Sequence, residues 1–279
     1  MTRETVYVRF GACKFRVQRW HKPQATHQTT LVMLHGFTGD GLDFEPLVEA
    51  LDVATLIAPD LLGHGGSSAP EEPLELYSIP EQLKQLEHLL DALDAPHPIL
   101  LGYSMGGRVA LQLAVHLEDH FEGLILIGAT PGLRASYERD ARREQDAKLA
   151  AQLAEQGPLA FLEMWQQKPI IATQERIANP WHAQMQQRRA QSSGIGWRNS
   201  LLAAGTGSMA SVWHDLEHVH TPALLITGQE DAKFHQLAEQ MRVLFPQVIH
   251  TSIPDAGHCA HLENPPPTAR AIHAFLKDL

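Results

Sequence analysis

Short apolar runs that end in glycine or proline, with helical patterns between several of them, constrain the fold of this chain most strongly. Six such runs occur, at 30–36, 54–60, 97–104, 123–132, 222–231 and 247–258. Leucines repeat on one helix face between 79 and 93, and a second helical pattern covers 106–119. Strands that alternate with helices form a parallel sheet covered on both faces. We therefore predict an α/β fold, with an antiparallel hairpin around Gly11 at its start.

Composition limits the class of protein. The 279 residues, 44% of them hydrophobic, suffice for one large α/β domain or two smaller ones. The formal net charge is −10 and no basic stripe stands out, so we expect no nucleic-acid partner. Cys13 and Cys259 cannot form a disulfide framework, which favours a reducing, cytoplasmic location. Because we find neither a signal-peptide pattern nor an apolar run near the roughly 20 residues that span a bilayer, we expect no membrane insertion.

The segment 134–198 breaks the alternation of strands and helices. It predicts several short helices and carries ten Lys/Arg against seven Asp/Glu, so its charge is +3. The remainder, with 12 basic and 25 acidic residues, carries −13. Such a local excess arises on solvated helix faces with paired charges, or on a lid that recognises an anion. We predict an α/β core of 1–133 and 199–279, with 134–198 inserted as a helical lid.

The pentapeptide GYSMG, residues 102–106, lies between a predicted strand and a predicted helix. It fits G-x-S-x-G, the pattern of a nucleophile elbow, in which small residues flank a serine on a sharp turn. The hydroxyl then projects above the C-terminal edge of the sheet, where the free amides and the dipole of the helix N-terminus point. This context predicts that Ser104 is a reactive residue rather than a structural one.

A serine of this kind needs a base, and the base needs a carboxylate that orients it. In this type of fold the carboxylate precedes the histidine along the chain. Asp231 closes the run ALLITGQED, and His258 ends the run that finishes in IPDAGH. We predict a triad of Ser104, His258 and Asp231, with Glu230 and Asp255 as weaker alternatives for the acid.

The motif HGFTGD, residues 35–40, follows the first central strand. In this arrangement the loop after that strand supplies one oxyanion-hole amide, and the residue after the nucleophile supplies the other. We therefore predict that the backbone N–H groups of Phe37 and Met105 form the oxyanion hole.

Two other motifs bear on metals and cofactors. His214, His218 and His220 lie together in HDLEHVH, but neither an H-E-x-x-H motif nor a cysteine cluster accompanies them, so we expect no metal site. The stretch GHGGSS at 63–68 lacks the spacing of a dinucleotide fingerprint, and we expect no cofactor.

These motifs resemble the α/β-hydrolase superfamily over nearly the whole chain. More narrowly, the chain resembles the 2-succinyl-6-hydroxy-2,4-cyclohexadiene-1-carboxylate (SHCHC) synthases of menaquinone and phylloquinone biosynthesis. HGFTGD, DLLGHGGSS and GYSMGGRVAL are widespread in the superfamily, whereas PGLRASYERDARR, WQQKP and EDAKF are more specific. The resemblance implies a mostly parallel central sheet with helices on both faces and a helical lid insertion.

The resemblance also implies an elimination rather than a hydrolysis. Members of the family remove pyruvate from 2-succinyl-5-enolpyruvyl-6-hydroxy-3-cyclohexene-1-carboxylate to give SHCHC. Ser104, polarised by His258 and Asp231, would be the base, and the oxyanion-hole amides would stabilise the enolate on the succinyl ketone. Such a lyase consumes no water and uses no cofactor.

The substrate of this family carries three carboxylates, which planar guanidinium groups bind bidentately. Carried over by motif, the resemblance implies that the substrate contacts Tyr103, Arg108, Arg142, Trp165, Arg189 and Lys233. The stretch ARRE leaves Arg142 and Arg143 both open, and AQSSG leaves Arg188 and Arg189 both open, because the family has an asparagine-rich stretch there. A cationic lid over a polycarboxylate would explain the charge of 134–198.

Two other functions remain alternatives from the sequence. A serine esterase or a C–C bond hydrolase of the same fold would share the triad, the oxyanion hole and the lid, but would need fewer arginines. A non-catalytic protein of this fold would bind a ligand or partner, although such proteins usually lose a triad member. For the lyase we expect a monomer or a weak homo-oligomer.

Overall fold

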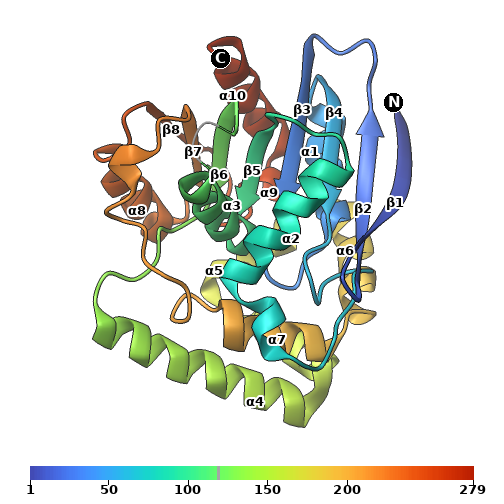
Figure 1. Ribbon diagram of the computed structural model, residues 1–279, viewed down its shortest axis with the longest axis vertical. Coiled ribbons are helices and arrows are strands. Elements are labelled where there is room, and N and C mark those ends of the chain that lie inside the picture. Colours follow the sequence, from blue (N-terminus) through green and yellow to red (C-terminus); the bar gives the residue numbers. More distant parts are fainter. Residues whose placement is uncertain (118–119) are drawn as a thin grey trace.

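An eight-stranded sheet runs through the protein, as the computed structural model shows for residues 1–117 and 120–279 (Figure 1). The strand order is β1-β2-β4-β3-β5-β6-β7-β8. The strands are β1 (Thr2–Phe10), β2 (Cys13–His21), β3 (His27–Leu34), β4 (Val53–Pro59), β5 (Ile99–Tyr103), β6 (Gly123–Ile127), β7 (Ala223–Gly228) and β8 (Val248–Ile253).

The six runs predicted from the sequence form the parallel part of this sheet. β4, β3, β5, β6, β7 and β8 pair in parallel, while β1 and β2 form the antiparallel hairpin predicted around Gly11. β2 then joins the sheet by pairing antiparallel with β4. β5, β6 and β7 are buried along their whole length, as expected for strands covered on both faces.

Helices cover both faces of the sheet. α2 (Ile79–Ala92), α3 (Met105–His116) and α8 (Ala232–Arg242) pack on one face, and α1 (Glu45–Ala50), α9 (Ala260–Glu263) and α10 (Pro265–Lys277) on the other. Short 3-10 helices occur at Gly41–Phe44, Leu74–Tyr77, Thr173–Arg176 and Leu216–His218. α2 and α3 confirm the two helical patterns, although residues 118–119 of the second pattern lie outside the described residues.

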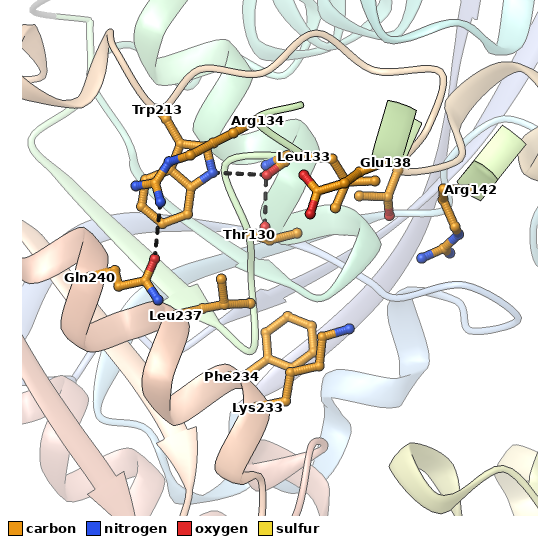
Figure 2. A pocket seen from close by; sticks show the side chains of 12 residues that line it. Thr130, Leu133, Arg134, Glu138, Arg142, Trp213, Lys233, Phe234, Leu237 and Gln240 are labelled. Carbon is orange, nitrogen blue, oxygen red and sulfur yellow. Dashed lines mark hydrogen bonds between the residues drawn. The ribbon is translucent and has the colours of Figure 1, made fainter. Parts of the chain in front are cut away.

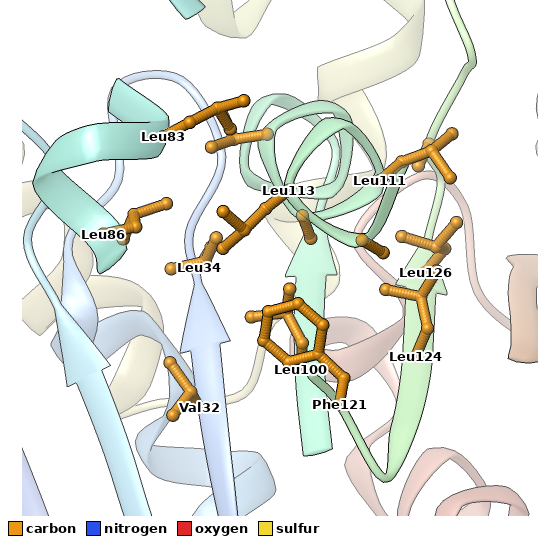
Figure 3. Close-up of a cluster of buried hydrophobic side chains, with 14 of the residues drawn as sticks. Val32, Leu34, Leu83, Leu86, Leu100, Leu111, Leu113, Phe121, Leu124 and Leu126 are labelled. Carbon is orange, nitrogen blue, oxygen red and sulfur yellow. The ribbon is translucent and has the colours of Figure 1, made fainter. Parts of the chain in front are cut away.

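The core on the α2–α3 face consists of leucines and other aliphatic residues from strands and helices. Figure 3 shows Leu83 and Leu86 of α2 and Leu113 of α3 against Val32 and Leu100 of the central strands. Each of these side chains is at most 8% exposed. Burying one leucine is worth about 2 kcal/mol, so this layer anchors α3, and with it the turn at its N-terminus.

Helices α4–α7, inserted between β6 and β7, occupy 136–204 and are called here the helical insertion. They are α4 (Ser136–Gln166), α5 (Pro169–Ala172), α6 (Trp181–Ala190) and α7 (Gly194–Ala204). α4 consists of two helical segments, 136–156 and 158–166, and the first of them is longer than the short helices that we predicted. Gly157 separates the two segments with the non-helical angles φ 81° and ψ 168°, and Pro158 follows it at the start of the second segment. α7 spans position 198, where we expected the insertion to end.

The helical insertion has a small hydrophobic core of its own. α4 and α7 lie side by side across one end of the sheet (Figure 1) and bury Phe161, Leu162, Trp197 and Leu201 between them. Phe37, in the loop after β3, packs against the same cluster. The insertion therefore covers the end of the sheet where β3 and β5 finish. Across the described residues, no helix combines the length and apolar character needed to cross a membrane.

Gly106, in the first turn of α3, allows this helix to approach β3 closely. A Cβ atom at Gly106 would lie 2.1 Å from the carbonyl oxygen of Leu34, and the amide of Gly106 donates to the carbonyl of His35 at 3.0 Å. We expect Gly106→Ala to lower the free energy of unfolding by about 1–3 kcal/mol, because the backbone of β3 cannot yield to the added methyl group.

Urea unfolding followed by circular dichroism measures this change, with Gly194→Ala as the matched control. Gly194 also begins a helix, but its added Cβ would make only an ordinary contact, at 3.4 Å, with Pro158. We expect the control to shift stability by less than about 1 kcal/mol. Equal losses in the two variants would contradict the steric explanation.

Candidate active site

Ser104 lies at a left-handed turn between β5 and α3. Its backbone angles are φ 51° and ψ −106°, and its amide donates to the carbonyl of Ile127 at 2.9 Å. A non-glycine residue in this conformation is strained by about 1–3 kcal/mol and persists only where its surroundings enforce it. Gly102 makes the turn possible, because a Cβ there would lie 2.4 Å from the carbonyl oxygen of Gly106. The turn has the geometry that the sequence predicts for a nucleophile elbow.

A continuous hydrogen-bond chain connects Ser104, His258 and Asp231. The Ser104 hydroxyl lies 2.9 Å from Nε2 of His258, and Nδ1 of the same ring lies 2.7 Å from Oδ2 of Asp231. The His258 and Asp231 side chains are 2% and 7% exposed. A hydroxyl held by an imidazole that a buried carboxylate orients can be deprotonated at the moment of reaction.

Asp231 uses its two carboxylate oxygens for different purposes. As the N-cap of α8 it accepts, through Oδ1, a hydrogen bond of 3.3 Å from the amide of Phe234. Its Oδ2 is thereby free to accept from His258. An acid that also caps a helix is fixed in rotation, which holds the imidazole in one orientation. The neighbouring Glu230 instead forms an exposed ion pair with Arg176.

Close packing fixes the ring of His258. The ring centroids of Phe234 and Tyr103 lie 4.5 Å and 5.4 Å from its own. Gly128, with φ 56°, makes room on a third side, because a Cβ there would lie 2.7 Å from the imidazole. Tyr103 is thus placed behind the histidine, and burial raises its pKa well above its ordinary value.

Phe37 and Met105 lie beside the serine, as the oxyanion-hole prediction requires. Both line the same cavity as Ser104 and His258. Met105 is the first residue of α3, so its N–H has no intrahelical partner and lies at the positive end of the helix dipole. The loop that carries Phe37 approaches β5 so closely that a Cβ on Gly36 would lie 2.6 Å from the ring of Tyr103.

Four cationic side chains line the cavity above Ser104. They are Arg108 of α3, Arg142 of α4, Lys168 just before α5 and Lys233 of α8. Asp146 is the carboxylate that lines it with them. Trp165, Leu149 and Ile171 contribute apolar walls. Against a chain whose net charge is −10, this local positive excess fits a ligand with several negative charges.

Arg108 carries a charge in a buried wall of the cavity. Its Nη1 donates to the carbonyl of Ala204 at 2.7 Å. Burial, together with the nearby charge of Arg142, lowers the pKa of Arg108 to about 10, although Asp146 counteracts this. The guanidinium therefore stays charged at neutral pH while a second cation lies close by. An anion bound between Arg108 and Arg142 would relieve this repulsion.

The structure distinguishes Arg142 from Arg143. Arg142 lines the cavity and its Nε lies 2.9 Å from Oδ1 of Asp146, one helical turn away. Arg143 turns toward the carbonyl of Gly207 and the carboxylate of Asp140 on its own helix. Burial raises the pKa of Asp146, while Arg142 opposes that shift. Only the first arginine of this pair is placed to reach a ligand beside Ser104.

Arg188 and Arg189 both lie outside the set of residues that line this cavity. Arg189 is 5% exposed and donates from Nη1 to Gln174 at 3.0 Å. Its Nε finds no hydrogen-bond partner in the part of the chain that the structure describes. Arg188 pairs with two aspartates of the loop after β3. Of the six side chains expected to contact substrate, Arg108, Arg142, Trp165 and Lys233 line the cavity, whereas Tyr103 and Arg189 do not.

Lys168 and Asp146 line the cavity although the sequence analysis did not select them. Lys168 lies in the WQQKP motif, and its Nζ is 5.4 Å from the ring centroid of Trp165. Asp146 follows Arg142 by four residues, the spacing of an ion pair on one helix face. The WQQKP motif could have indicated Lys168, and the i,i+4 spacing from Arg142 could have indicated Asp146.

A second depression adjoins the cavity and shares Arg142, Thr206, Lys233 and Phe234 with it. Figure 2 shows Arg142 and Lys233 reaching toward the same space from α4 and α8. The guanidinium of Arg134 stacks 3.7 Å above the ring of Trp213 at its far side. Within the described residues, no group of three or more His, Cys, Asp or Glu side chains is placed to hold a metal ion.

Comparisons with known proteins identify the family of the chain. The family model described as "alpha/beta hydrolase fold" matches residues 29–265. A Bacillus subtilis protein named provisionally as SHCHC synthase is 35% identical over 249 residues, which cover 89% of this chain and 90% of that protein. The SHCHC synthase of Yersinia pestis is 30% identical over 95% of this chain and 94% of its own.

A solved structure supports the same placement. The structure of MenH from S. aureus superimposes with a TM-score of 0.86 at 29% identity, and the match covers 94% of this chain and 98% of that one. The overall fold of the chain thus matches that of a solved protein. The chain is a member of the α/β-hydrolase fold family and, within it, of the SHCHC synthases.

Proposed function

We propose that this protein eliminates pyruvate from 2-succinyl-5-enolpyruvyl-6-hydroxy-3-cyclohexene-1-carboxylate to give SHCHC, a step of menaquinone or phylloquinone biosynthesis. The observation that carries the proposal is the position of Arg108, Arg142, Lys168 and Lys233 around one serine. This substrate has three carboxylates, and a hydrolase acting on a neutral ester has no use for four cations. The named synthases among the relatives support the same assignment.

Ser104 acts as the base in this proposal. Its hydroxyl gives its proton to Nε2 of His258 and takes the proton from the ring carbon next to the succinyl ketone. The C–H electron pair forms an enolate, whose oxygen accepts hydrogen bonds from the amides of Phe37 and Met105. The charge then moves through the ring double bond and breaks the C–O bond to the enolpyruvyl group. Pyruvate enolate leaves and takes up the proton held by His258, so that Asp231 remains a carboxylate throughout.

The four cations are of two chemical kinds. Arg108 and Arg142 have guanidinium groups on the walls beside Ser104, where a planar fork can bind a carboxylate bidentately. Lys168, just before α5, and Lys233 of α8 supply flexible point charges. The helical insertion, which carries two of the four cations, acts as a lid in this proposal.

Because both cysteines are free thiols, we place the activity in the cytoplasm.

Pyruvate release tests the proposed function directly. With the enolpyruvyl substrate generated in place from isochorismate and 2-oxoglutarate by the upstream synthase, we expect the protein to accelerate release of pyruvate together with the diene absorbance. Ser104→Ala removes the base and should lower kcat by about 100- to 10,000-fold. A wild-type rate equal to spontaneous elimination would contradict the lyase assignment and favour an esterase or C–C bond hydrolase.

Arg142→Ala tests whether the cations recognise substrate. Loss of a charge-assisted contact worth about 1.5–3 kcal/mol should lower kcat/KM for the tricarboxylate by about 10- to 100-fold. Arg143→Ala is the matched control, since this neighbour faces away from the cavity, and it should change kcat/KM by less than about two-fold. If the protein also hydrolyses a neutral activated ester, Arg142→Ala should leave kcat/KM for that ester nearly unchanged. An equal loss of kcat/KM on the ester would indicate that the residue supports the fold.

Lys168→Met removes a positive charge from the lining of the cavity while keeping the approximate length and the apolar stem of the side chain. Because Lys168 interacts as a flexible point charge, we expect KM to rise about three- to ten-fold with kcat little changed. The difference between variant and wild type should shrink as KCl is raised from 20 to 500 mM. A loss confined to kcat would instead place Lys168 next to the reacting atoms.

A further inference from the structure

A buried charge network joins α6 of the helical insertion to the loop that carries Phe37. Nε of Arg188 lies 3.0 Å from Oδ1 of Asp40, and its Nη2 lies 2.6 Å from Oδ1 of Asp43. The three side chains are 20%, 5% and 8% exposed, so water screens the network poorly. One guanidinium thus bridges two carboxylates that are far from it in sequence.

The sheet holds the same loop from the other side. Arg16 of β2 places Nη2 3.1 Å from Oδ2 of Asp40 and Nε 2.6 Å from Oδ2 of Asp60. Asp60 in turn accepts a hydrogen bond of 2.8 Å from the amide of Gly41. Asp40 therefore lies between two guanidinium groups, one from the sheet and one from the insertion.

The position of Asp40 determines the shape of the turn that precedes it. Its carboxylate caps the short 3-10 helix at Gly41–Phe44 by accepting from the amide of Leu42 at 3.0 Å. Just before it, Thr38 has φ 67°, and the amide of Gly39 donates to Gly36 at 3.1 Å. Phe37 lies inside this tight turn, so a shift of Asp40 would rotate the peptide that presents the Phe37 amide.

Phe37 is itself in contact with the helical insertion. Its ring packs edge-on against Trp165 and Phe161, at centroid distances of 5.1 Å and 6.3 Å, and lies 6.3 Å from Trp197. The insertion therefore contacts the loop at two points, through apolar rings at Phe37 and through Arg188 at Asp40 and Asp43. The position of the loop is therefore coupled to α4 and α7 through the rings and to α6 through Arg188.

We propose that Arg188 is a positioning residue for the oxyanion hole: by bridging Asp40 and Asp43 from α6, it fixes the turn whose Phe37 amide faces the reacting oxygen. The inference deepens the proposed function and rests on it only for the substrate used in the assay. Arg188 touches no reacting atom, so it acts through the loop. The insertion then contributes to the chemistry as well as to substrate binding.

The bridge requires arginine rather than any cation. A guanidinium presents several N–H donors in a rigid fork, whereas a lysine ammonium is a compact point charge that suits one carboxylate better than two. Burial alone would lower the pKa of Arg188, yet the charges of Asp43 and Asp40 outweigh burial and raise it. The side chain thus remains charged throughout the range in which the enzyme could be assayed.

Steady-state kinetics of Arg188→Ala and Arg188→Lys on the tricarboxylate test the proposal. A misplaced oxyanion donor should lower kcat of the alanine variant about ten- to a hundred-fold, with KM within about three-fold of wild type. The lysine variant should recover part of kcat. Arg198→Ala is the matched control, because Arg198 is another half-buried arginine of the insertion, paired with Glu71 rather than with this loop. We expect it to keep kcat within about two-fold.

A second measurement does not depend on the lyase assignment. A fluorophosphonate labels an activated serine, and its phosphoryl oxygen occupies the oxyanion hole, so the labelling rate of Ser104 by intact-mass spectrometry reports on the hole alone. We expect Arg188→Ala to slow labelling at least about ten-fold, and Arg188→Lys less. Thermal unfolding of both variants separates this effect from loss of fold, and the lysine variant decides the matter if the alanine variant unfolds.

The two measurements distinguish the two hypotheses. Absence of pyruvate release by wild type, with slow labelling of Arg188→Ala, would overturn the proposed function and leave the positioning role supported. Equal labelling rates in wild type and folded Arg188 variants would overturn the positioning role. A rise in KM at unchanged kcat would also overturn it, since that result would make Arg188 a determinant of binding.

Discussion

The left-handed turn at Ser104 is the constraint on which the rest of the site depends. A serine with φ 51° is unfavourable by itself, so the turn exists only because α3 is pressed against β3 and β5 through glycines. The burial of aliphatic side chains beneath α3 supplies the free energy that holds it there. The same packing leaves the first amide of α3, that of Met105, beside the hydroxyl without an intrahelical partner. The packing of α3 therefore produces both the strained turn at Ser104 and the positive helix end beside its hydroxyl.

Two sets of charged groups surround that turn, and they differ in whether their charges are already paired. Asp231 and His258 are paired and nearly excluded from water, so their geometry is complete without a ligand. Arg108 and Arg142 face a cavity that a single carboxylate shares with them. Their positive charges are therefore only partly balanced until a ligand binds. The first group is preorganised for proton transfer, and the second makes binding of a polyanion favourable.

Local patterns in the sequence predicted the hairpin, the six parallel strands and the two long helices of the core, because each burial pattern repeats within a short window. They also selected Ser104, His258 and Asp231, which the structure brings within hydrogen-bond distance. The length of the first segment of α4 was missed, although the Gly-Pro pair at 157–158 does mark its end. Arg188 was one of two candidates in a stretch of ambiguous register. Its partners lie almost 150 residues away, and no local window contains such a pairing.

The helical insertion is continuous in sequence, has its own small core and carries much of the substrate chemistry, which makes it look like a detachable module. The contacts of Phe37 and of Asp40 with it indicate the opposite. If residues 136–204 were exchanged for those of another protein of this fold, the loop after β3 would no longer match the insertion that packs on it. Specificity and rate would then change together unless the loop at 36–44 were exchanged with the insertion. The unit of functional exchange in this protein is consequently a pair of segments that only the folded chain brings together.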